Sequence, residues 1–179
     1  MPFIDELLKY KNEVFLETGT YQGDTVLKIA NSDSFKFAEI ISLELSKDFF
    51  KQCTERFKNE KRIHIYSANS KTDLWDILRD IPVEITFWLD SHWSGVPNVG
   101  CDSETKCPVL FELEQIKKHP IKSHVIIIDD IRLMDGDHFP VTLPEILNKL
   151  YEINPLYKIK FYDDYCARND ILVACLNKD

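Results

Sequence analysis

A chain of 179 residues, 44% hydrophobic and 12% aromatic, can bury one substantial core, and we interpret residues 1–179 as a single domain. The 22 basic and 30 acidic side chains give a net charge of -8, which repels phosphate backbones and argues against nucleic acid as a partner. The longest apolar runs are strand-sized and no basic-then-apolar leader is present, so we expect a cytoplasmic protein without a membrane span.

Seven apolar, strand-like runs alternate along the chain with five segments of helical spacing. The strands are expected over 14–17, 40–45, 63–68, 85–90, 125–130, 157–162 and 171–176. The helices are expected over 24–32, 46–60, 71–81, 108–119 and 142–153. This alternation predicts a parallel sheet with helices on both faces. Only the turn 163–170 separates the last two runs, too little for a crossover helix, so they should form an antiparallel hairpin.

The first expected strand runs into "ETGTYQG", residues 17–23, just before a helix. Glycine fits a turn where the backbone must swing or a ligand approaches closely, and the following helix offers free amides. The spacing is GxxxG rather than the GxGxxG of dinucleotide sites, which favours a cofactor without phosphates. A strand-turn-helix with no ligand also needs small residues here.

Polar residues follow the second and third strands as well. Glu44 ends the second strand, where a carboxylate can accept hydrogen bonds from a ribose diol; the alternative is a solvated strand-end carboxylate. Asn69 and Ser70 follow the third strand. Asn69 could instead cap the helix that begins near Lys71.

Carboxylates end both of the most apolar runs, "ITFWLD" and "VIIIDD". If the fourth and fifth strands are neighbours, Asp90 and the pair Asp129 and Asp130 emerge side by side at the carboxyl edge of the sheet. Carboxylates this close raise one another's pKa unless a cation lies between them, and a hard divalent ion such as Mg²⁺ suits oxygen ligands. In the alternative interpretation, one of the pair caps the following turn and the other faces solvent.

These patterns resemble the class I methyltransferases that use S-adenosylmethionine, and more specifically the cation-dependent macrocin and sugar O-methyltransferases of antibiotic and glycan biosynthesis. The similarity covers residues 87–132, with "WLDSHWSG", "CPVLFELEQI" and "VIIIDDIR", and the ExGxxxG loop extends it over most of the chain. It implies a Rossmann-like α/β fold, with a mostly parallel seven-stranded sheet, a C-terminal antiparallel hairpin and helices on both faces. It also implies S-adenosylmethionine and a divalent cation, Mg²⁺ being the expected ion.

The resemblance assigns roles to individual residues. The residues implied to bind S-adenosylmethionine are Glu17, Gly19, Thr20, Tyr21, Gly23, Glu44, Asn69, Ser70 and Asp90. Asp90, Asp129 and Asp130 are implied to hold the ion. At position 69 the family usually has an aspartate that contacts the adenine amino group, so Asn69 keeps an acceptor but loses the charge.

The loop 91–107 is long and irregular, which is typical of functional segments. His92 could act with Asp90 as a general base, ligate the ion, or bond a loop carbonyl, and its ordinary pKa suits proton abstraction near neutrality. We expect Trp88 in the core and Trp93 beyond the strand end, where it could stack on a sugar. A zinc set of His92, Cys101 and Cys107 lacks a fourth ligand and is not expected.

Several further side chains are expected at the surface or in the interior. Five scattered cysteines without a CxxC pair indicate mostly buried thiols in a reducing compartment. Arg132 could bind an acidic acceptor, although a surface salt bridge is the ordinary outcome. Glu112 and Glu114 are expected on the outer surface of their helix.

We therefore hypothesise an S-adenosylmethionine-dependent O-methyltransferase, cation-dependent in the manner of those relatives, acting on a hydroxyl of a sugar or another small molecule. The alternatives are a hydroxylase-like relative that does not methylate and a non-catalytic nucleotide-binding module. Only about a dozen residues precede the first strand, fewer than in many relatives. A homodimer could supply the missing wall of the substrate site.

Overall fold

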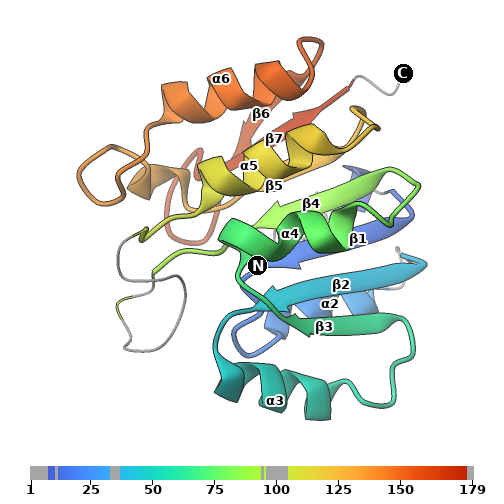
Figure 1. Cartoon of the computed structure of the whole chain (residues 1–179). Helices are drawn as coiled ribbons and strands as arrows, with labels where there is room; N and C mark the ends of the chain where they lie inside the picture. The colour runs from blue at the N-terminus through green and yellow to red at the C-terminus, as the bar shows by residue number, and fades with distance from the viewer. Residues whose placement is uncertain (1–7, 11, 33–36, 94, 96–104, 177–179) are drawn as a thin grey trace.

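A computed structural model describes residues 8–10, 12–32, 37–93, 95 and 105–176. Their centre is a seven-stranded sheet in the order β3-β2-β1-β4-β5-β7-β6 (Figure 1). The strands are β1 (Val14–Thr18), β2 (Glu39–Glu44), β3 (Ile63–Ser67), β4 (Ile85–Leu89), β5 (Val125–Ile128), β6 (Lys158–Tyr162) and β7 (Ile171–Cys175). Strands β1 to β5 pair in parallel, whereas β7 runs antiparallel to both β5 and β6. The predicted mostly parallel sheet with a C-terminal antiparallel hairpin is confirmed.

Helices cover both faces of the sheet, as predicted (Figure 1). They are α2 (Asp24–Asn31), α3 (Lys47–Arg56), α4 (Ser70–Leu78), α5 (Val109–Lys118) and α6 (Leu143–Ile153), with short 3-10 turns η1 (Leu8–Tyr10) and η2 (Ile131–Leu133). Helices α4, α5 and α6 contribute to one apolar cluster, and α2 and α3 contribute to the other. Among the described helices, none is long and apolar enough to cross a membrane.

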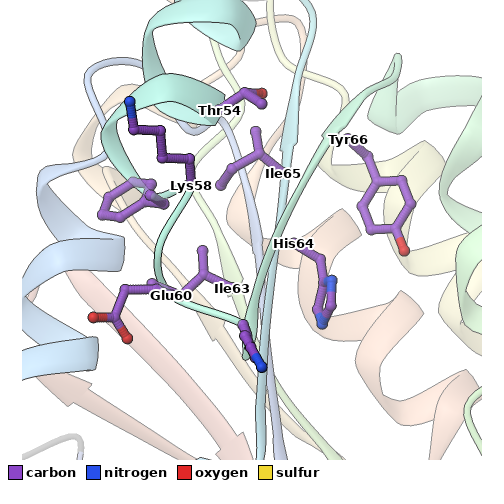
Figure 2. Close-up of a pocket in the computed structure, with 9 residues that line it drawn as sticks. Thr54, Lys58, Glu60, Ile63, His64, Ile65 and Tyr66 are labelled. Atoms are coloured by element: carbon purple, nitrogen blue, oxygen red, sulfur yellow. The ribbon is translucent and has the colours of Figure 1, made fainter.

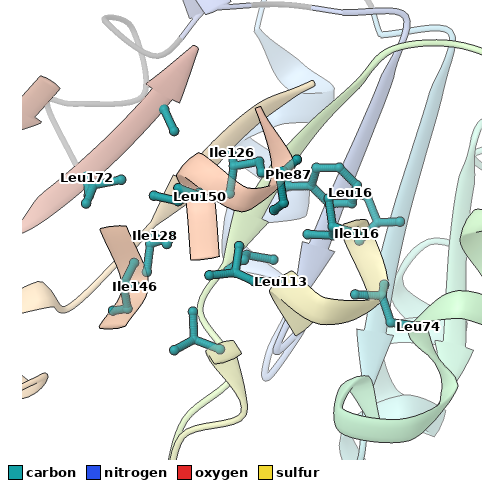
Figure 3. Close-up of a cluster of buried hydrophobic side chains, with 14 of the residues drawn as sticks. Leu16, Leu74, Phe87, Leu113, Ile116, Ile126, Ile128, Ile146, Leu150 and Leu172 are labelled. Atoms are coloured by element: carbon teal, nitrogen blue, oxygen red, sulfur yellow. The ribbon is translucent and has the colours of Figure 1, made fainter. Parts of the chain in front are cut away.

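Alternation along the central strands divides the core into these two clusters. In β4, Phe87 points to the α4–α6 face and Trp88 to the α2–α3 face, because successive strand residues face opposite sides of the sheet. Figure 3 shows Phe87 among Leu113 of α5 and Leu150 of α6. Trp88 is 1% exposed, which confirms its expected place in the core. Strands covered on both faces are apolar throughout, as in "VIII" of β5.

The carboxyl ends of three adjacent strands lie level with one another. The backbone N–H of Asp90 donates to the Thr18 carbonyl at 3.2 Å, and that of Asp129 donates to the Leu89 carbonyl at 3.2 Å. Strand β4 ends at Leu89 and β5 at Ile128, one and two residues earlier than the sequence predicted. The acidic residues that follow are therefore released from strict alternation at the same edge of the sheet.

Candidate active site

The glycine loop after β1 is packed directly against the end of β4. Gly19 has φ +88°, and a Cβ added there would lie 2.6 Å from the backbone oxygen of Asp90. The N–H groups of Gly19 and Thr20 both donate to the Leu43 carbonyl, at 3.0 and 3.2 Å. Only glycine tolerates this conformation together with such a close approach. The predicted cofactor loop and the acidic strand end therefore touch through the backbone.

A buried chain of hydrogen bonds fixes the first residues of this loop. Ser42 of β2 donates to Glu17 Oε2 at 2.6 Å, and the hydroxyls of Ser42 and Thr20 lie 2.6 Å apart. Glu17 is 1% exposed, and burial raises its pKa to about 8. Tyr21 is half exposed and Gly23 forms the N-cap of α2. The five predicted loop residues thus form one compact turn.

Glu44 also serves this turn. Its carboxylate accepts the N–H of Tyr21 and the N–H of Ser46, each at 2.7 Å. The side chain is 3% exposed, so the alternative of a solvated strand-end carboxylate is wrong. Burial raises the pKa of Glu44, and these backbone contacts oppose that rise. If Glu44 also binds a ribose, as predicted, its two oxygens must accept those hydrogen bonds in addition to the ones from the Tyr21 and Ser46 N–H groups.

At the end of β3, the two predicted residues have different surroundings. The Asn69 side chain accepts the Lys71 N–H at 3.0 Å and caps α4, which is the alternative considered from the sequence. The Ser70 hydroxyl is buried and donates to the Ser91 hydroxyl at 3.2 Å. Ser70 thereby joins the β3 end to the segment that follows Asp90.

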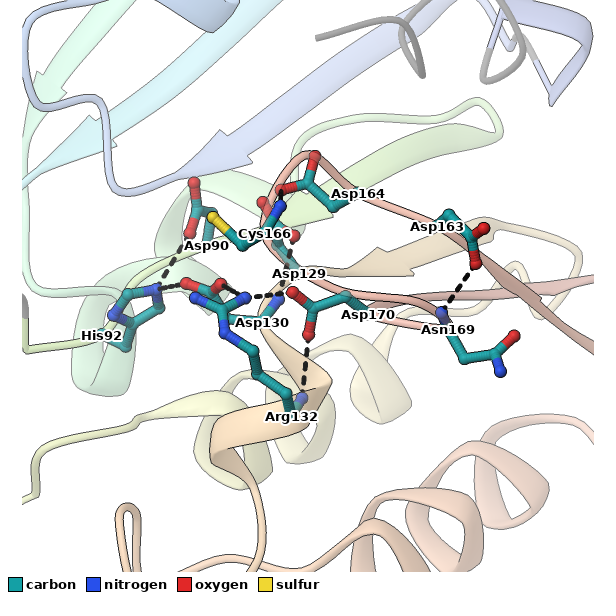
Figure 4. Close-up of polar contacts among 10 residues, drawn as sticks. All are labelled: Asp90, His92, Asp129, Asp130, Arg132, Asp163, Asp164, Cys166, Asn169 and Asp170. Atoms are coloured by element: carbon teal, nitrogen blue, oxygen red, sulfur yellow. Dashed lines mark hydrogen bonds and ion pairs between the residues drawn. The ribbon is translucent and has the colours of Figure 1, made fainter.

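Three side chains converge beyond β4 and β5 (Figure 4). Potential ligand atoms of Asp90, His92 and Asp130 all lie within 4.8 Å of one another. The Nε2 atom of His92 is 3.2 Å from Asp90 Oδ1 and also pairs with Asp130 Oδ2. Its ring packs against Phe139, with centroids 5.3 Å apart. Among the described residues, His92 therefore contacts carboxylates.

This convergence perturbs each of the three groups. Burial raises the pKa of Asp90, and contact with His92 opposes that rise. For Asp130 burial acts in the same direction, but contact with His92 and Arg132 prevails and lowers its pKa. Burial disfavours the imidazolium of His92, yet Asp130 and Asp90 outweigh it and raise its pKa to about 10. Such opposed shifts among adjacent groups are typical of functional sites.

Asp129 lies beside this group and differs from Asp130. Its Oδ1 accepts the Asp130 N–H at 2.9 Å, while Asp130 has the left-handed conformation, φ +56°. Burial, then the charges of Asp90 and Asp130, raise the pKa of Asp129 to about 8, and the charge of Asp164 adds to the rise. Asp164 comes from the β6–β7 turn, so a fourth carboxylate faces the cluster. No local pattern in the sequence indicates this long-range approach.

Arg132 links the cluster to the same turn. Its guanidinium pairs with Asp130 and with Asp170, and Asp170 also accepts the Arg132 N–H at 2.9 Å. Arg132 therefore forms the expected salt bridge from the surface, but its partner Asp170 is 0% exposed. Arg132 connects Asp130 to Asp170 and fixes the orientation of Asp130 (Figure 4).

Glu112 was expected on the outer surface of α5, and this expectation is wrong. It is 1% exposed and lies near the hydroxyls of Ser70 and Thr18, and burial raises its pKa to about 7. The sequence contained a signal, since Glu112 shares the helical stripe of the buried Val109, Leu113 and Ile116. Glu114, by contrast, is half exposed and pairs with Lys149. Glu112 is thus a buried neighbour of the cluster formed by Asp90, His92 and Asp130.

Several buried polar atoms around Asp90 lack a well-formed hydrogen bond within the described residues. They are Thr18 Oγ1, Trp88 Nε1, Glu112 Oε1 and both ring nitrogens of His92. Buried polar groups are normally satisfied, so a concentration of exceptions indicates a place that takes a ligand or water. Oxygen and nitrogen donors among several negative charges fit a divalent cation.

Other candidates contribute less. Trp93 is 44% exposed and its ring lies near the Lys106 ammonium, which leaves it accessible beyond the strand end as predicted. Cys107 is a buried free thiol, and Cys101 of the zinc set lies outside the described residues. Cys53 and Cys175 are also buried and free, whereas Cys166 is exposed, in line with mostly buried thiols.

A pocket also lies at the outer edge of β3, three strands away from β4 in the sheet order (Figure 2). Its lining includes Thr54 and Lys58 of the α3 side and His64 and Tyr66 of β3. None of the predicted site residues lines it. It therefore has no bearing on the cluster around Asp90.

Comparison with solved structures identifies the architecture. A methyltransferase from Podospora anserina with SAH bound superposes with a TM-score of 0.64 at 14% identity, over 98% of this chain and 76% of that one. An O-methyltransferase from Bacillus cereus in complex with SAH gives 0.61 at 14% identity, over 96% and 77%. The chain has a Rossmann-like methyltransferase fold. A protein described as an rRNA methylase from Clostridium thermocellum gives 0.56 at 15% identity, over 95% and 92%.

The sequence matches no protein-family model and no curated protein. The methyltransferase fold places ligands beyond the carboxyl ends of its parallel strands. In this chain the glycine loop, Glu44 and the Asp90 cluster all lie at that edge. Because the same fold serves different acceptors, the substrate must be argued from the side chains.

Proposed function

We propose that this protein is an S-adenosylmethionine-dependent O-methyltransferase that uses a divalent cation and acts on a hydroxyl of a sugar or another small molecule. The observation that carries the proposal is the contact between Gly19 and the Asp90 carbonyl. It joins the loop suited to the methyl donor to the acidic cluster suited to the acceptor. The net charge of -8 supports a small acceptor over nucleic acid.

The donor would be held by the turn that begins at Glu17 and by Glu44. S-adenosylmethionine supplies a methyl group already activated by its sulfonium, so the protein has mainly to position and deprotonate the acceptor. Gly19 lets the backbone lie close to the donor, and the Glu44 carboxylate holds the turn through the Tyr21 N–H. The half-exposed Trp93 is available to stack on a sugar face.

The acceptor would be bound at the other half of the site. A divalent cation held there lowers the pKa of a coordinated hydroxyl. Asp90 and Asp130 would supply oxygens to it, and Arg132 fixes Asp130 from behind. Asp129 would add its charge from beside them. Asp90 would accept the hydroxyl proton. His92 lies beside it, but its pKa is raised to about 10, so it already carries a proton at neutral pH.

Transfer of a labelled methyl group from S-adenosylmethionine to a panel of sugar and polyol acceptors tests this proposal. Asp129→Asn with Asp130→Asn should lower turnover at least about 100-fold, because the charges that bind and polarise the acceptor are lost. S-adenosylmethionine affinity should change less than about 3-fold, since the glycine turn is intact. Asp76→Asn with Asp80→Asn is the matched control, because it removes two exposed carboxylates of the α4 end.

Two results would count against the proposal. Equal turnover in the acidic double variant and its control would remove the cluster from the reaction. Cofactor binding without transfer to any acceptor, in wild-type protein, would favour a nucleotide-binding module. Loss of cofactor binding together with turnover would indicate that the two aspartates serve folding.

A further inference from the structure

The donor atoms around Asp90 have an unusual composition for a site that takes a hard cation. Within the described residues, the group able to surround one ion is Asp90, His92 and Asp130, two carboxylates and one imidazole. The expectation from the sequence was three carboxylates. Asp129 is not part of the set, and its Oδ1 accepts the Asp130 N–H instead.

His92 is held in place to act as a ligand. Its side chain is 16% exposed, and its ring is packed on Phe139, which is itself 4% exposed. The next residue, Trp93, donates its N–H to the Lys106 carbonyl at 2.8 Å, which anchors the backbone. The imidazole therefore has little freedom to leave the two carboxylates, and a ligand already in place loses little entropy on binding.

Within the described residues, the ring nitrogens of His92 meet only the two carboxylates of the same set. Neither nitrogen makes a well-formed hydrogen bond within the described residues, although Nε2 lies between Asp90 and Asp130. Trp88 is 1% exposed, and its indole N–H, also without a well-formed bond, lies close enough to Asp90 to favour the charged form of that carboxyl. These buried, unpartnered donors and acceptors distinguish the group from an ordinary surface acidic cluster.

We propose that His92 is a nitrogen ligand, with Asp90 and Asp130, of a first-row transition ion of the Fe²⁺, Co²⁺, Ni²⁺ or Zn²⁺ class rather than Mg²⁺. Imidazole suits these ions, whereas Mg²⁺ prefers oxygen ligands and retains its waters. Arg132 fixes Asp130 from outside the set, as outer partners of metal ligands commonly do. The inference rests on the proposed cation-dependent function, and it leaves proton transfer to a carboxylate beside the ion.

Calorimetric titration with Co²⁺ and with Mg²⁺ tests this assignment. Wild-type protein should bind Co²⁺ at least about 10-fold more tightly than Mg²⁺. His92→Asn should weaken Co²⁺ binding by about 10- to 100-fold and Mg²⁺ binding by less than about 3-fold. His138→Asn is the matched control, because His138 is exposed and pairs with Asp135 away from the set. It should leave both affinities unchanged.

A second measurement does not depend on a variant that folds. Proton NMR of the wild-type Co²⁺ protein should show a strongly shifted, solvent-exchangeable imidazole N–H signal, because the nitrogen that does not bind the ion keeps its proton. Absence of this signal, equal affinity for the two ions, equal losses for both ions in His92→Asn, or binding of neither ion would overturn the assignment.

Titration of the same samples with S-adenosylhomocysteine separates this inference from the proposed function. If the nucleoside binds but the metal results contradict the assignment, only the role of His92 fails. If the nucleoside does not bind to wild-type protein, the methyltransferase proposal fails first.

Discussion

Histidines lie at both ends of β4 and β5, buried at the amino ends and partly buried at the carboxyl ends, and their surroundings differ. At the amino ends, His124 Nδ1 accepts the Ile85 N–H at 3.1 Å, and its Nε2 is 3.0 Å from His119 Nδ1. His119 Nε2 in turn lies 2.9 Å from the Ile81 carbonyl. Every ring nitrogen of this pair has a partner that suits a neutral imidazole. Burial, and then the neighbouring His119, lower the pKa of His124 to about 3.

At the carboxyl ends, His92 has two carboxylates beside it and no well-formed hydrogen bond within the described residues. Its pKa rises to about 10 because the carboxylates outweigh burial. The same side chain is therefore neutral and hydrogen-bonded at one end, and charged between two carboxylates at the other. Closed hydrogen-bond networks stabilise a fold, whereas open ones with converging charge leave room for a ligand.

The largest effect on stability is expected where the carboxyl end is most constrained. Gly19→Ala should lower the free energy of unfolding by roughly 2–4 kcal/mol, because it adds strain at φ +88° and a 2.6 Å approach to the Asp90 oxygen. Gly136→Ala is the control, with the same φ and a nearest contact of 3.4 Å to a side chain. Denaturant unfolding of both variants gives two losses of unfolding free energy, and their difference is the cost of the close approach to Asp90. Equal losses would mean that the turn can move away from β4.

A smaller effect is expected at the amino end. His124→Leu should cost about 1–3 kcal/mol at pH 7.5, because the buried Ile85 N–H loses its acceptor. Below pH 6.5 His124 is protonated in the unfolded wild-type chain, whereas in the folded protein it stays neutral down to about pH 3. Wild-type stability should therefore fall with acid, by up to about 1.4 kcal/mol per pH unit from this group.

Denaturant midpoints measured between pH 7.5 and 5 check this pH dependence. The His124→Leu variant should lack the contribution of His124 to this pH dependence. Its stability should therefore fall less steeply with acid than that of wild-type protein. The same titration with the exposed His138→Gln should follow wild-type protein. Parallel curves for His124→Leu and wild-type protein would contradict the neutral, satisfied pair.

The opposite slope is expected from the carboxyl end. The folded pKa of Glu17, about 8, lies above its ordinary value of 4.5, so the folded state holds the extra proton between these values. Stability from this group falls as the pH rises through that window. Glu17→Gln should therefore gain stability relative to wild-type protein between pH 7 and 9, by roughly 1 kcal/mol. Thermal melting of both proteins across this pH range checks the gain, and the exposed Glu13→Gln is the control. If the difference in stability between Glu17→Gln and wild-type protein does not change with pH, the raised pKa of Glu17 is contradicted.

The sequence predicted the strands and the edge at which the acidic residues meet, because both follow from local patterns. Hydrophobic runs indicated β4 and β5, and turn residues indicated the final hairpin. The neighbours of each polar side chain depend on contacts between distant segments, which periodicity does not contain. Asp170 reaches Arg132 across 38 residues in this way. Glu112 is the exception, since its position on an apolar stripe was visible.

The role of Glu44 shows the same limit. Its place at the end of β2 was predicted, but its hydrogen bond to the Tyr21 N–H depends on the path of a turn 23 residues earlier. The histidine pair at the amino end was missed for a similar reason, because His119 and His124 become partners only when the connection between α5 and β5 folds back. A sequence pattern locates such residues on an edge of the sheet without naming their partners.

Calorimetric titration of the wild-type protein with S-adenosylhomocysteine is the most direct test of the methyltransferase site. One nucleoside should bind per chain and raise the melting temperature, because a ligand of the folded state alone stabilises it. His124→Leu should reduce stability but keep that stoichiometry. If wild-type protein gives neither binding heat nor a melting shift, with or without a divalent cation, the carboxyl edge of this sheet is not a methyl-donor site.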